Sequence, residues 1–351
     1  MAEPELRAGP PWVTEEMVAA QPALARALLD SPPEGAAAFA AAVKEAHGAG
    51  LPVSVVGCGT SEHGAMAVAE LVSAALGGGW PPAVFARQSL DAAEHPQRGG
   101  VCIGISHDGG TRATTLALEA AAAAGVTTAV VTAVPDGPTA GLAEIVLVTP
   151  VHDDSWCHTV AYTSSILTGA VLARELGMEG VDGEGAETLL RDALDAGADA
   201  APLAGSERIL TAGAELDYIT ARELALKIAE GARVQTAALH LETLLHGHLA
   251  GEDAGTAVVI VDSDRASARI GRRAATAARA VGEIGMPVAT LGGPPATTLA
   301  PPLARLLGGA AALQSLTLGL VRARGVNPDL IRREEEPYRR AGEAGEGGGD
   351  W

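Results

Sequence analysis

Three segments of the chain combine residue types that could act on a small polar ligand. Two of them are glycine-containing turns, at residues 57–61 (GCGTS) and 106–111 (SHDGGT), each placed between an apolar stretch and a helical one. Free backbone N–H groups at the start of a helix, together with hydroxyl side chains, favour an anion or a sugar oxygen. The alternative is structural: Gly59 makes a tight turn and Ser61 caps the helix that follows.

The third segment could move a proton. Lys227 and Glu230 are three residues apart and share a helix face, and His246 follows in a glycine-containing loop. A carboxylate and an imidazole brought together would serve for proton transfer next to a carbonyl group. The alternative is that Glu223 and Lys227 form a solvated pair and that His246 is an ordinary loop histidine. The lysines of the chain are Lys44 and Lys227, so an imine with a carbonyl substrate would need one of them.

The elements that position these segments are predicted from two recurring patterns. Short Val- and Ile-rich stretches, typical of strands buried on both faces, occupy residues 53–56, 101–105, 126–131, 145–148, 208–211 and 257–261. Longer stretches with helical propensity occupy residues 61–76, 111–124, 157–177, 215–230, 266–281 and 303–322. This alternation predicts an α/β fold with parallel sheets flanked by helices. The first two segments would then meet at the carboxyl edge of one sheet, where α/β proteins bind ligands.

The chain has 351 residues, which is the length of about two domains. An acidic stretch rich in Ala and Gly separates two alternating blocks and is predicted to be a linker. Gly59 and Gly213 each lead from a strand into a helix, an offset of 213 − 59 = 154 residues, which suggests a duplicated α/β unit. The predicted boundaries are residues 1–34 for an N-terminal segment, 35–180 for the first domain, 181–206 for the linker, 207–335 for the second domain and 336–351 for a flexible tail.

The charge and cysteine content of the chain narrow the classes of partner. Acidic residues number 43 against 24 basic ones, a formal net charge of −19, which argues against a nucleic-acid or membrane partner. Three cysteines without paired spacing favour a reducing cytoplasm, and the acidic start does not resemble an exported precursor.

The uncharged run at residues 155–173 is rich in hydroxyl side chains and is predicted to be a buried helix with the loop before it. No His or Cys pair has the spacing of a zinc motif, so no metal is expected.

Taken in order, these motifs resemble the sugar isomerase (SIS) domain family, in the tandem form of the isomerase half of glucosamine-6-phosphate synthase. Members of the family carry a G-x-G-T-S turn, an S-x-S-G-x-T turn, an A-L-K-x-x-E helix segment, an L-x-H-G-P loop and a terminal N-P-D region. The matching segments here are, in the same order, residues 57–61, 106–111, 225–230, 245–248 and 325–329. The resemblance covers residues 35–335 and implies two tandem SIS domains in a homodimer, and no cofactor is expected.

The family resemblance also implies roles for individual residues. Glu230 would be the base that moves a proton between C1 and C2 of a sugar. His246 would assist ring opening, and in the synthase it acts in the site of the neighbouring subunit. The residues implied to bind the substrate are Thr60, Ser61, Ser106, His107, Asp108, Thr111 and Lys227.

The chain also departs from the family pattern. Asp108 stands where the family has the second serine of its phosphate loop. A carboxylate there would repel a phosphate, so either Asp108 turns away to cap the following helix or the ligand has no phosphate at this point. An Asp108 that occupied the helix end itself would leave a site that prefers a neutral or amino-bearing group. Residues 158–160 (HTV) replace the synthase's S-T-K, and the chain after Pro328 has arginines but no lysine. Both lysines of the synthase are therefore missing, and ammonia transfer from glutamine is not expected of this chain alone.

Two functions from different classes remain. The first is isomerisation of a sugar phosphate or amino sugar, or the related deamination or deglycation, by an enediol route that needs no imine. The second is a non-catalytic protein that binds or senses a carbohydrate derivative, because both family lysines are absent. A cytoplasmic homodimer is expected.

Overall fold

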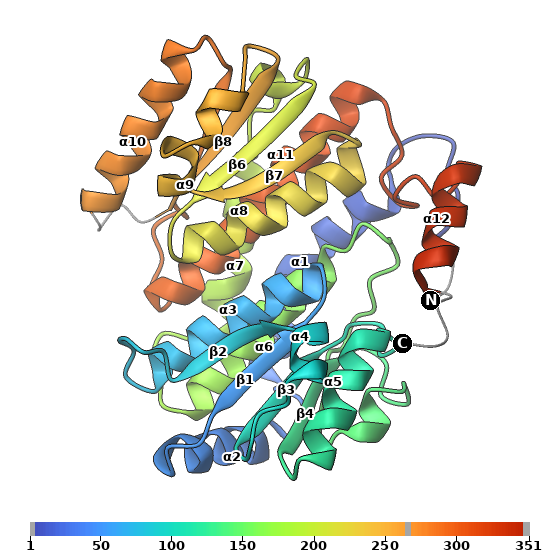
Figure 1. Ribbon diagram of the computed structural model, residues 1–351, viewed down its shortest axis with the longest axis vertical. Helices are drawn as coiled ribbons and strands as arrows, with labels where there is room; N and C mark the ends of the chain where they lie inside the picture. Colours follow the sequence, from blue (N-terminus) through green and yellow to red (C-terminus); the bar gives the residue numbers. More distant parts are fainter. Residues whose placement is uncertain (1–3, 264–267, 347–351) are drawn as a thin grey trace.

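The computed structural model describes residues 4–263 and 268–346. It contains two sheets, one above the other, with helices between them (Figure 1). The first sheet has the order β2-β1-β3-β4-β5 and comprises β1 (Val53–Gly57), β2 (Val84–Gln88), β3 (Val101–Ile105), β4 (Thr127–Thr132) and β5 (Ile145–Val148). The second has the order β7-β6-β8-β9 and comprises β6 (Arg208–Gly213), β7 (Gln235–His240), β8 (Thr256–Asp262) and β9 (Val288–Gly292). All pairs of neighbouring strands are parallel, so the predicted α/β fold with two parallel sheets is confirmed.

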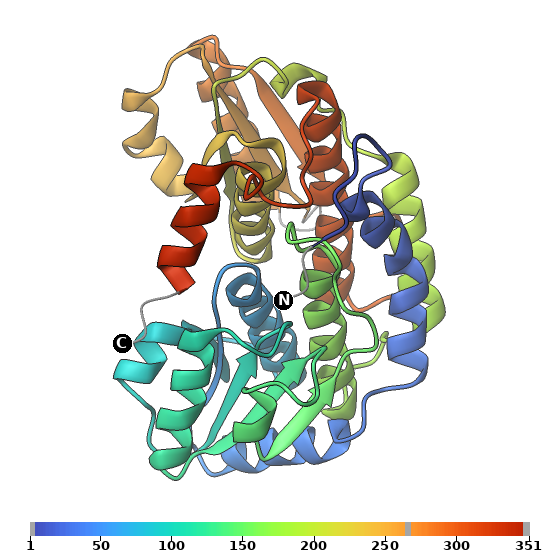
Figure 2. The same ribbon diagram turned by 90° about the vertical axis from the view of Figure 1, so that its right-hand side faces the viewer.

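Helices cover both faces of each sheet (Figures 1 and 2). The inner layer, between the sheets, is formed by α3 (Thr60–Ala75), α6 (Val160–Glu175), α8 (Leu216–Lys227) and α11 (Pro301–Arg324). The outer face of the first sheet carries α4 (Ser89–Glu94) and α5 (Arg112–Ala123), and that of the second carries α9 (Leu241–Leu245) and α10 (Ala268–Glu283). Three further helices, α1 (Val13–Asp30), α2 (Ala36–Gly48) and α7 (Gly183–Ala196), pack against the inner layer.

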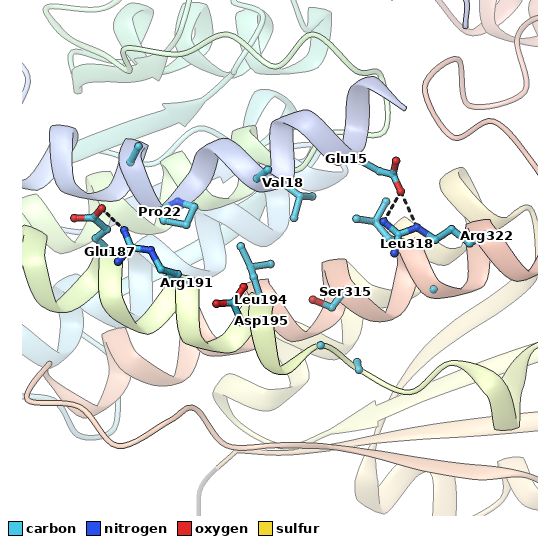
Figure 3. Close-up of a pocket in the computed structure, with 15 residues that line it drawn as sticks. Glu15, Val18, Pro22, Glu187, Arg191, Leu194, Asp195, Ser315, Leu318 and Arg322 are labelled. Carbon is cyan, nitrogen blue, oxygen red and sulfur yellow. Dashed lines mark hydrogen bonds and ion pairs between the residues drawn. The ribbon is translucent and has the colours of Figure 1, made fainter. Parts of the chain in front are cut away.

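The predicted linker at residues 181–206 is not a loose connection, because it contains helix α7. The apolar face of α7 is buried, and the helix packs against α1 and α11. A groove of about 560 Å³ lies between these three helices, with the ion pairs Glu15–Arg322 and Glu187–Arg191 near its ends (Figure 3). The amphipathic pattern of α7, and not the acidic composition of the segment, therefore decides its structure.

The predicted flexible tail also begins with regular structure. Residues 336–346 form α12 (Glu336–Glu346), whereas residues 347–351 lie outside the described residues. The ion pair Arg339–Glu343 links successive turns of this helix at 2.7 Å.

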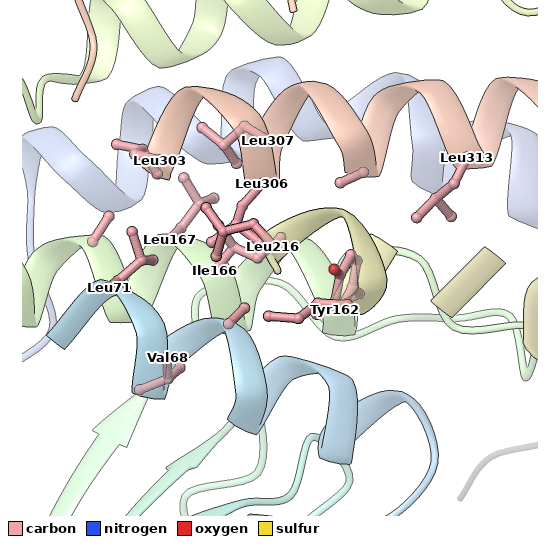
Figure 4. Close-up of a cluster of buried hydrophobic side chains, with 14 of the residues drawn as sticks. Val68, Leu71, Tyr162, Ile166, Leu167, Leu216, Leu303, Leu306, Leu307 and Leu313 are labelled. Atoms are coloured by element: carbon pink, nitrogen blue, oxygen red, sulfur yellow. The ribbon is translucent and has the colours of Figure 1, made fainter. Parts of the chain in front are cut away.

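A single hydrophobic core extends across both domains. Leu71 of α3 and Ile166 of α6 belong to the same buried cluster as Leu216 of α8 and Leu307 of α11 (Figure 4). Smaller clusters lie beneath the outer helices of each sheet. The two sheets are therefore not joined by a simple hinge, because the largest apolar cluster contains side chains from both.

The sequence prediction missed three strands, namely β2, β7 and β9. Each is an edge strand of its sheet, with partly exposed side chains. A search for Val- and Ile-rich stretches finds strands that are buried on both faces, which most of the inner strands are. These three edge strands have one neighbour each and carry polar side chains such as Gln88 and Gln235, so they lack that signal, whereas the edge strand β5 is apolar and was predicted.

The two domains repeat one strand–turn–helix unit, but with a different offset from that predicted. A Cβ atom on Gly57 would lie 2.3 Å from the carbonyl oxygen of Ser61, and one on Gly213 would lie 2.4 Å from that of Asp217. Gly57 is therefore the partner of Gly213, at an offset of 213 − 57 = 156 residues, and the predicted pairing of Gly59 with Gly213 is wrong. The glycine that both domains require is the last residue of the strand, where the first turn of the helix approaches closely.

The longest apolar segments are core helices. The uncharged run at residues 155–173 forms a loop and then α6, in which every residue from Val160 to Ala173 is buried, as predicted. Helix α11 is long and apolar enough to cross a membrane, but 78% of its most apolar window is buried inside the protein. Burial of this extent is typical of the central helix of a packed domain.

Candidate functional site

The first two segments meet at the carboxyl edge of the first sheet, because β1 and β3 are neighbouring parallel strands. The turn after β1 leads into α3, and Gly59 is the N-cap residue of that helix. Thr60 is buried, and its hydroxyl donates to Glu223 Oε1 at 3.4 Å. The half-buried Ser61 does not cap the helix; its N–H donates to the carbonyl of Cys58. Of the structural alternative, the tight turn at Gly59 is present, but the helix cap by Ser61 is not.

The turn after β3 contains both buried and exposed residues. Ser106 is fully buried, and its hydroxyl has no hydrogen-bond partner among the described residues. Gly109 has a φ of +66° and accepts the hydroxyl of Thr139 on its carbonyl oxygen at 3.1 Å. Thr111 is the exposed N-cap of α5 and makes no side-chain capping bond. Ser106 therefore has a bonding capacity that a ligand atom or a water molecule could use.

The carboxylate of Asp108 contacts two imidazoles. Its Oδ1 lies 3.0 Å from His152 Nε2, and its Oδ2 lies 3.4 Å from His158 Nε2. Burial alone would raise the pKa of Asp108, but the hydrogen bond and charge of His158 outweigh burial and lower it. Of the two roles considered from the sequence, capping α5 is not the one adopted, since Thr111 is the N-cap residue.

His107 is held as a neutral hydrogen-bond acceptor. Its Nε2 accepts the backbone N–H of Asp153 at 2.8 Å, which assigns the ring proton to Nδ1. Burial lowers the pKa of His107 to about 3, and the nearby His158 adds to this effect. The ring centroid of His107 lies 5.3 Å from that of His152 and 5.8 Å from that of His158. At neutral pH, His107 therefore offers no positive charge to a ligand.

A buried carboxylate fixes the loop that carries His152 and His158. Asp153 is fully buried and accepts the backbone N–H groups of Thr159 at 2.6 Å and Ala161 at 3.2 Å, at the start of α6. Burial raises the pKa of Asp153. These bonds act as a helix cap that holds the two histidines against the turn after β3.

The N-P-D region near the end of the chain supports the same loop. Asp329 is fully buried, and its carboxylate accepts the backbone N–H of Thr14 at 2.8 Å, at the start of α1. It also accepts the hydroxyl of Ser155 at 3.4 Å. A residue close to the C-terminus therefore joins the start of the first helix to the loop beside the site.

A buried chain of charged groups links the two domains. Lys227 Nζ lies 2.5 Å from Glu230 Oε2 and 3.6 Å from Glu223 Oε1, and Glu223 Oε2 lies 2.6 Å from His63 Nδ1 of α3. Burial alone would lower the pKa of Lys227, but the charges of Glu230 and Glu223 outweigh burial and raise it. Lys227 is therefore protonated at neutral pH and acts as a counter-ion, which disfavours imine formation. The solvated Glu223–Lys227 pair of the alternative interpretation is wrong, since each side chain is 1% exposed.

Of the two carboxylates that contact Lys227, Glu230 is the one that a ligand can reach. Its side chain is 23% exposed, against 1% for Glu223. It lies in a π-helical turn, Ile228–Ala232, which continues α8 and is followed by Arg233 at a φ of +58°. Such turns are frequent at functional sites. The geometry therefore agrees with a role in proton transfer for Glu230.

His246 is not brought to Glu230 within one chain. It follows α9 on the outer side of the second sheet, and its side chain is 73% exposed. Its Nε2 lies 3.2 Å from Glu242 Oε2 and 3.5 Å from Arg273 Nη2. Any contact of His246 with a Glu230 carboxylate would therefore involve another copy of the chain.

Several residues of the site were missed or misjudged from the sequence. His63 follows Thr60 by three residues, so its position on the same face of α3 was a usable signal. Glu223 entered the sequence analysis only in the alternative interpretation, as a surface residue, because its spacing from Lys227 is also that of a solvated pair. His152 and His158 were not among the predicted site residues, because nothing local in the sequence indicates that both bond to Asp108.

The residues described, 4–263 and 268–346, contain no group of three or more His, Cys, Asp or Glu side chains that could hold a metal ion. The expectation that the site uses no metal or other cofactor stays a prediction. A cavity of about 430 Å³ lies at the carboxyl edge of the second sheet, lined by residues of α9 and α10, and includes none of the predicted site residues.

The SIS domain family model matches residues 53–174, which hold the first sheet and helices α3 to α6. No curated protein sequence matches the chain. Tagatose-6-phosphate ketose/aldose isomerase from Escherichia coli is 17% identical with a TM-score of 0.75, over 93% of this chain and 98% of that chain. The C-terminal domain of glucosamine-fructose-6-phosphate aminotransferase from Francisella tularensis is 16% identical with a TM-score of 0.70, over 93% and 99%. Glucosamine-6-phosphate deaminase from Thermotoga maritima is 18% identical with a TM-score of 0.69, over 90% and 96%.

Residues 53–174 therefore match the SIS domain family, and the two sheets have the tandem arrangement that the motifs predicted. The similar structures cover nearly the whole chain, so the resemblance is confirmed for the fold of both domains. At identities below 25%, this likeness establishes the fold alone.

Proposed function

We propose that the chain is an isomerase-type enzyme that moves a proton between C1 and C2 of a sugar derivative, with Glu230 as the base. The observation that carries this proposal is the partly exposed Glu230 carboxylate 2.5 Å from the buried ammonium group of Lys227. The ammonium group balances the charge of the carboxylate and holds it in place. The names of the similar structures, a ketose/aldose isomerase and a deaminase of sugar phosphates, support the same class of chemistry.

The proposed reaction needs no imine. Glu230 accepts the proton from the carbon next to the carbonyl group, and the electron pair of the broken C–H bond forms an enediolate, with the charge on the former carbonyl oxygen. The proton of the neighbouring hydroxyl group moves to that oxygen, and the protonated carboxyl group returns its proton to the former carbonyl carbon, so that no other reactant is consumed. The hydroxyls of Thr60, Ser61 and Ser106 are the proposed partners of the sugar oxygens. Deamination or deglycation would begin with the same proton transfer on an amino-bearing derivative.

Proton exchange in heavy water tests this proposal. Sugars that bind the protein should lose the NMR signal of the C2 proton, and Glu230→Gln should slow the exchange by about 100-fold or more, the contribution of a positioned base. The matched control is Glu283→Gln, the same change on the exposed surface of α10, which should leave the rate unchanged. Exchange at the native rate in Glu230→Gln would contradict the assigned base.

A non-catalytic sugar-binding or sensing protein is the second candidate. It is favoured by the absence of both lysines that the synthase pattern has in its site. The same experiment separates the two, since a sugar that binds to the native protein but never exchanges its C2 proton indicates a binding protein.

We also propose that the working unit is a cytoplasmic homodimer. The exposed His246 is free to enter a neighbouring subunit, which the family resemblance implies. The thiols of Cys58, Cys102 and Cys157 are free, which supports a reducing compartment.

A further inference from the structure

We propose that the sugar taken by this site presents a hydroxyl or ammonium group, and not a phosphate ester, to the turn after β3. This inference rests on the proposed function, because it concerns the substrate class of the same site. The determinant is a carboxylate–imidazole cluster, defined as Asp108, His152 and His158, at the carboxyl edge of the first sheet.

The first argument concerns hydrogen-bond donors. A phosphate is recognised by several donors, preferably charged ones. Here the Nε2 atoms of His152 and His158 both face the carboxylate of Asp108, at 3.0 Å and 3.4 Å. Asp108 therefore already occupies the imidazole nitrogens of the cluster as an internal anion, and a phosphate could use them only by displacing it.

The second argument concerns charge. The cluster is flanked by the buried Asp153, 3.8 Å from His158 Nδ1, and by Asp154, 3.6 Å from His152 Nδ1. The Asp154 side chain is 70% exposed and its charge is screened by water, so the carboxylates that count are Asp108 and Asp153. They face at most two charged imidazoles, and 2 − 2 leaves no net positive charge when both are protonated. The adjacent His107 is neutral because burial lowers its pKa to about 3. This edge therefore offers no net positive charge to a dianionic ester.

The third argument concerns what the cluster can accept. The side chain of Asp108 is 21% exposed, so it can receive a hydrogen bond from a hydroxyl or an ammonium group without leaving both imidazoles. Arg112 is exposed at the start of α5 and is the guanidinium nearest to this turn in the sequence, so it is the group to test for residual phosphate binding.

Calorimetric titration with matched pairs of ligands tests the inference. The probes are D-glucosamine and D-fructose, each against its 6-phosphate. At least one free sugar should bind the native protein ten times or more tightly than its 6-phosphate. Asp108→Asn removes the charge at nearly constant shape and should raise the affinity for the 6-phosphates about tenfold, which corresponds to about 1.4 kcal/mol. This gain should shrink with added salt.

The matched control is Asp154→Asn, which removes the same charge from the exposed end of the loop. It should change the affinity for the 6-phosphates less than twofold. Thermal melting checks the folding of each variant, and Asp108→Ser takes the place of the Asn variant if that one does not fold.

Tighter native binding of the 6-phosphates, or equal gains from Asp108→Asn and Asp154→Asn, would overturn the inference and leave the role of Glu230 intact, and a loss of that binding in Arg112→Gln would identify Arg112 as the phosphate ligand. Selective binding of a free sugar without exchange of its C2 proton would support the inference and overturn the proposed catalysis. Failure of every probe to bind would overturn both.

Discussion

At the scale of single residues, comparison of the two strand–turn–helix units identifies a glutamate with a strained backbone conformation. Glu215 has φ 54° and ψ −128°, and the equivalent Gly59 has φ 56° and ψ −127°. Glycine adopts this backbone region readily, whereas a side chain there costs roughly 1–3 kcal/mol. The first domain therefore uses the residue that the turn requires, and the second domain keeps a residue that the turn disfavours.

Replacing Glu215 by glycine should stabilise the protein. Relief of the strain is partly offset by the larger entropy of glycine in the unfolded chain, so the expected gain is about 1 kcal/mol, measured by urea denaturation. Glu215→Ala is the matched control, because it shortens the side chain but keeps the Cβ atom that causes the strain. Equal stability of the Gly and Ala variants would show that the backbone at this position is not strained.

At the scale of elements, the sequence predicted what depends on local composition. Strands such as β1 and β3 are apolar on both faces, and α6 is uncharged, so their burial was evident from the residues alone. The edge strand β7 has no such signal, and α7 was hidden by its acidic composition. The contacts of Asp108 could not be predicted, because His152 and His158 are 44 and 50 residues away and their approach depends on the cap that Asp153 makes.

The position of α9 makes the dimer proposal testable. Since His246 lies on the outer side of the second sheet, one chain does not supply the His246 imidazole to its own Glu230. Inactive Glu230→Gln and His246→Ala proteins, mixed under conditions of subunit exchange, should therefore regenerate up to one intact site per heterodimer. The measurement is C2 proton exchange after mixing. If proton-exchange activity does not recover, although differently tagged subunits show that the subunits have exchanged, each site is built within one chain.

At the scale of the whole molecule, the continuous inner core makes the two domains depend on each other. Leu307 of α11 is fully buried in the same cluster as Leu71 of α3 and Ile166 of α6. The charged chain from His63 to Lys227 crosses the same region between α3 and α8. Breaking this core should therefore loosen both sheets, although each sheet belongs to a different repeat.

Leu307→Ala tests this coupling. Removal of a fully buried leucine from a tightly packed core costs about 2–5 kcal/mol. If unfolding is cooperative across both domains, amide hydrogen exchange should become faster by the same factor in β3 of the first sheet and in β8 of the second. The reciprocal control is Leu118→Ala in α5, which is buried under the outer face of the first sheet and should also accelerate exchange in β8. Faster exchange confined to β8 for Leu307→Ala and to β3 for Leu118→Ala would show that the domains unfold independently, and that the shared core joins two separate folding units.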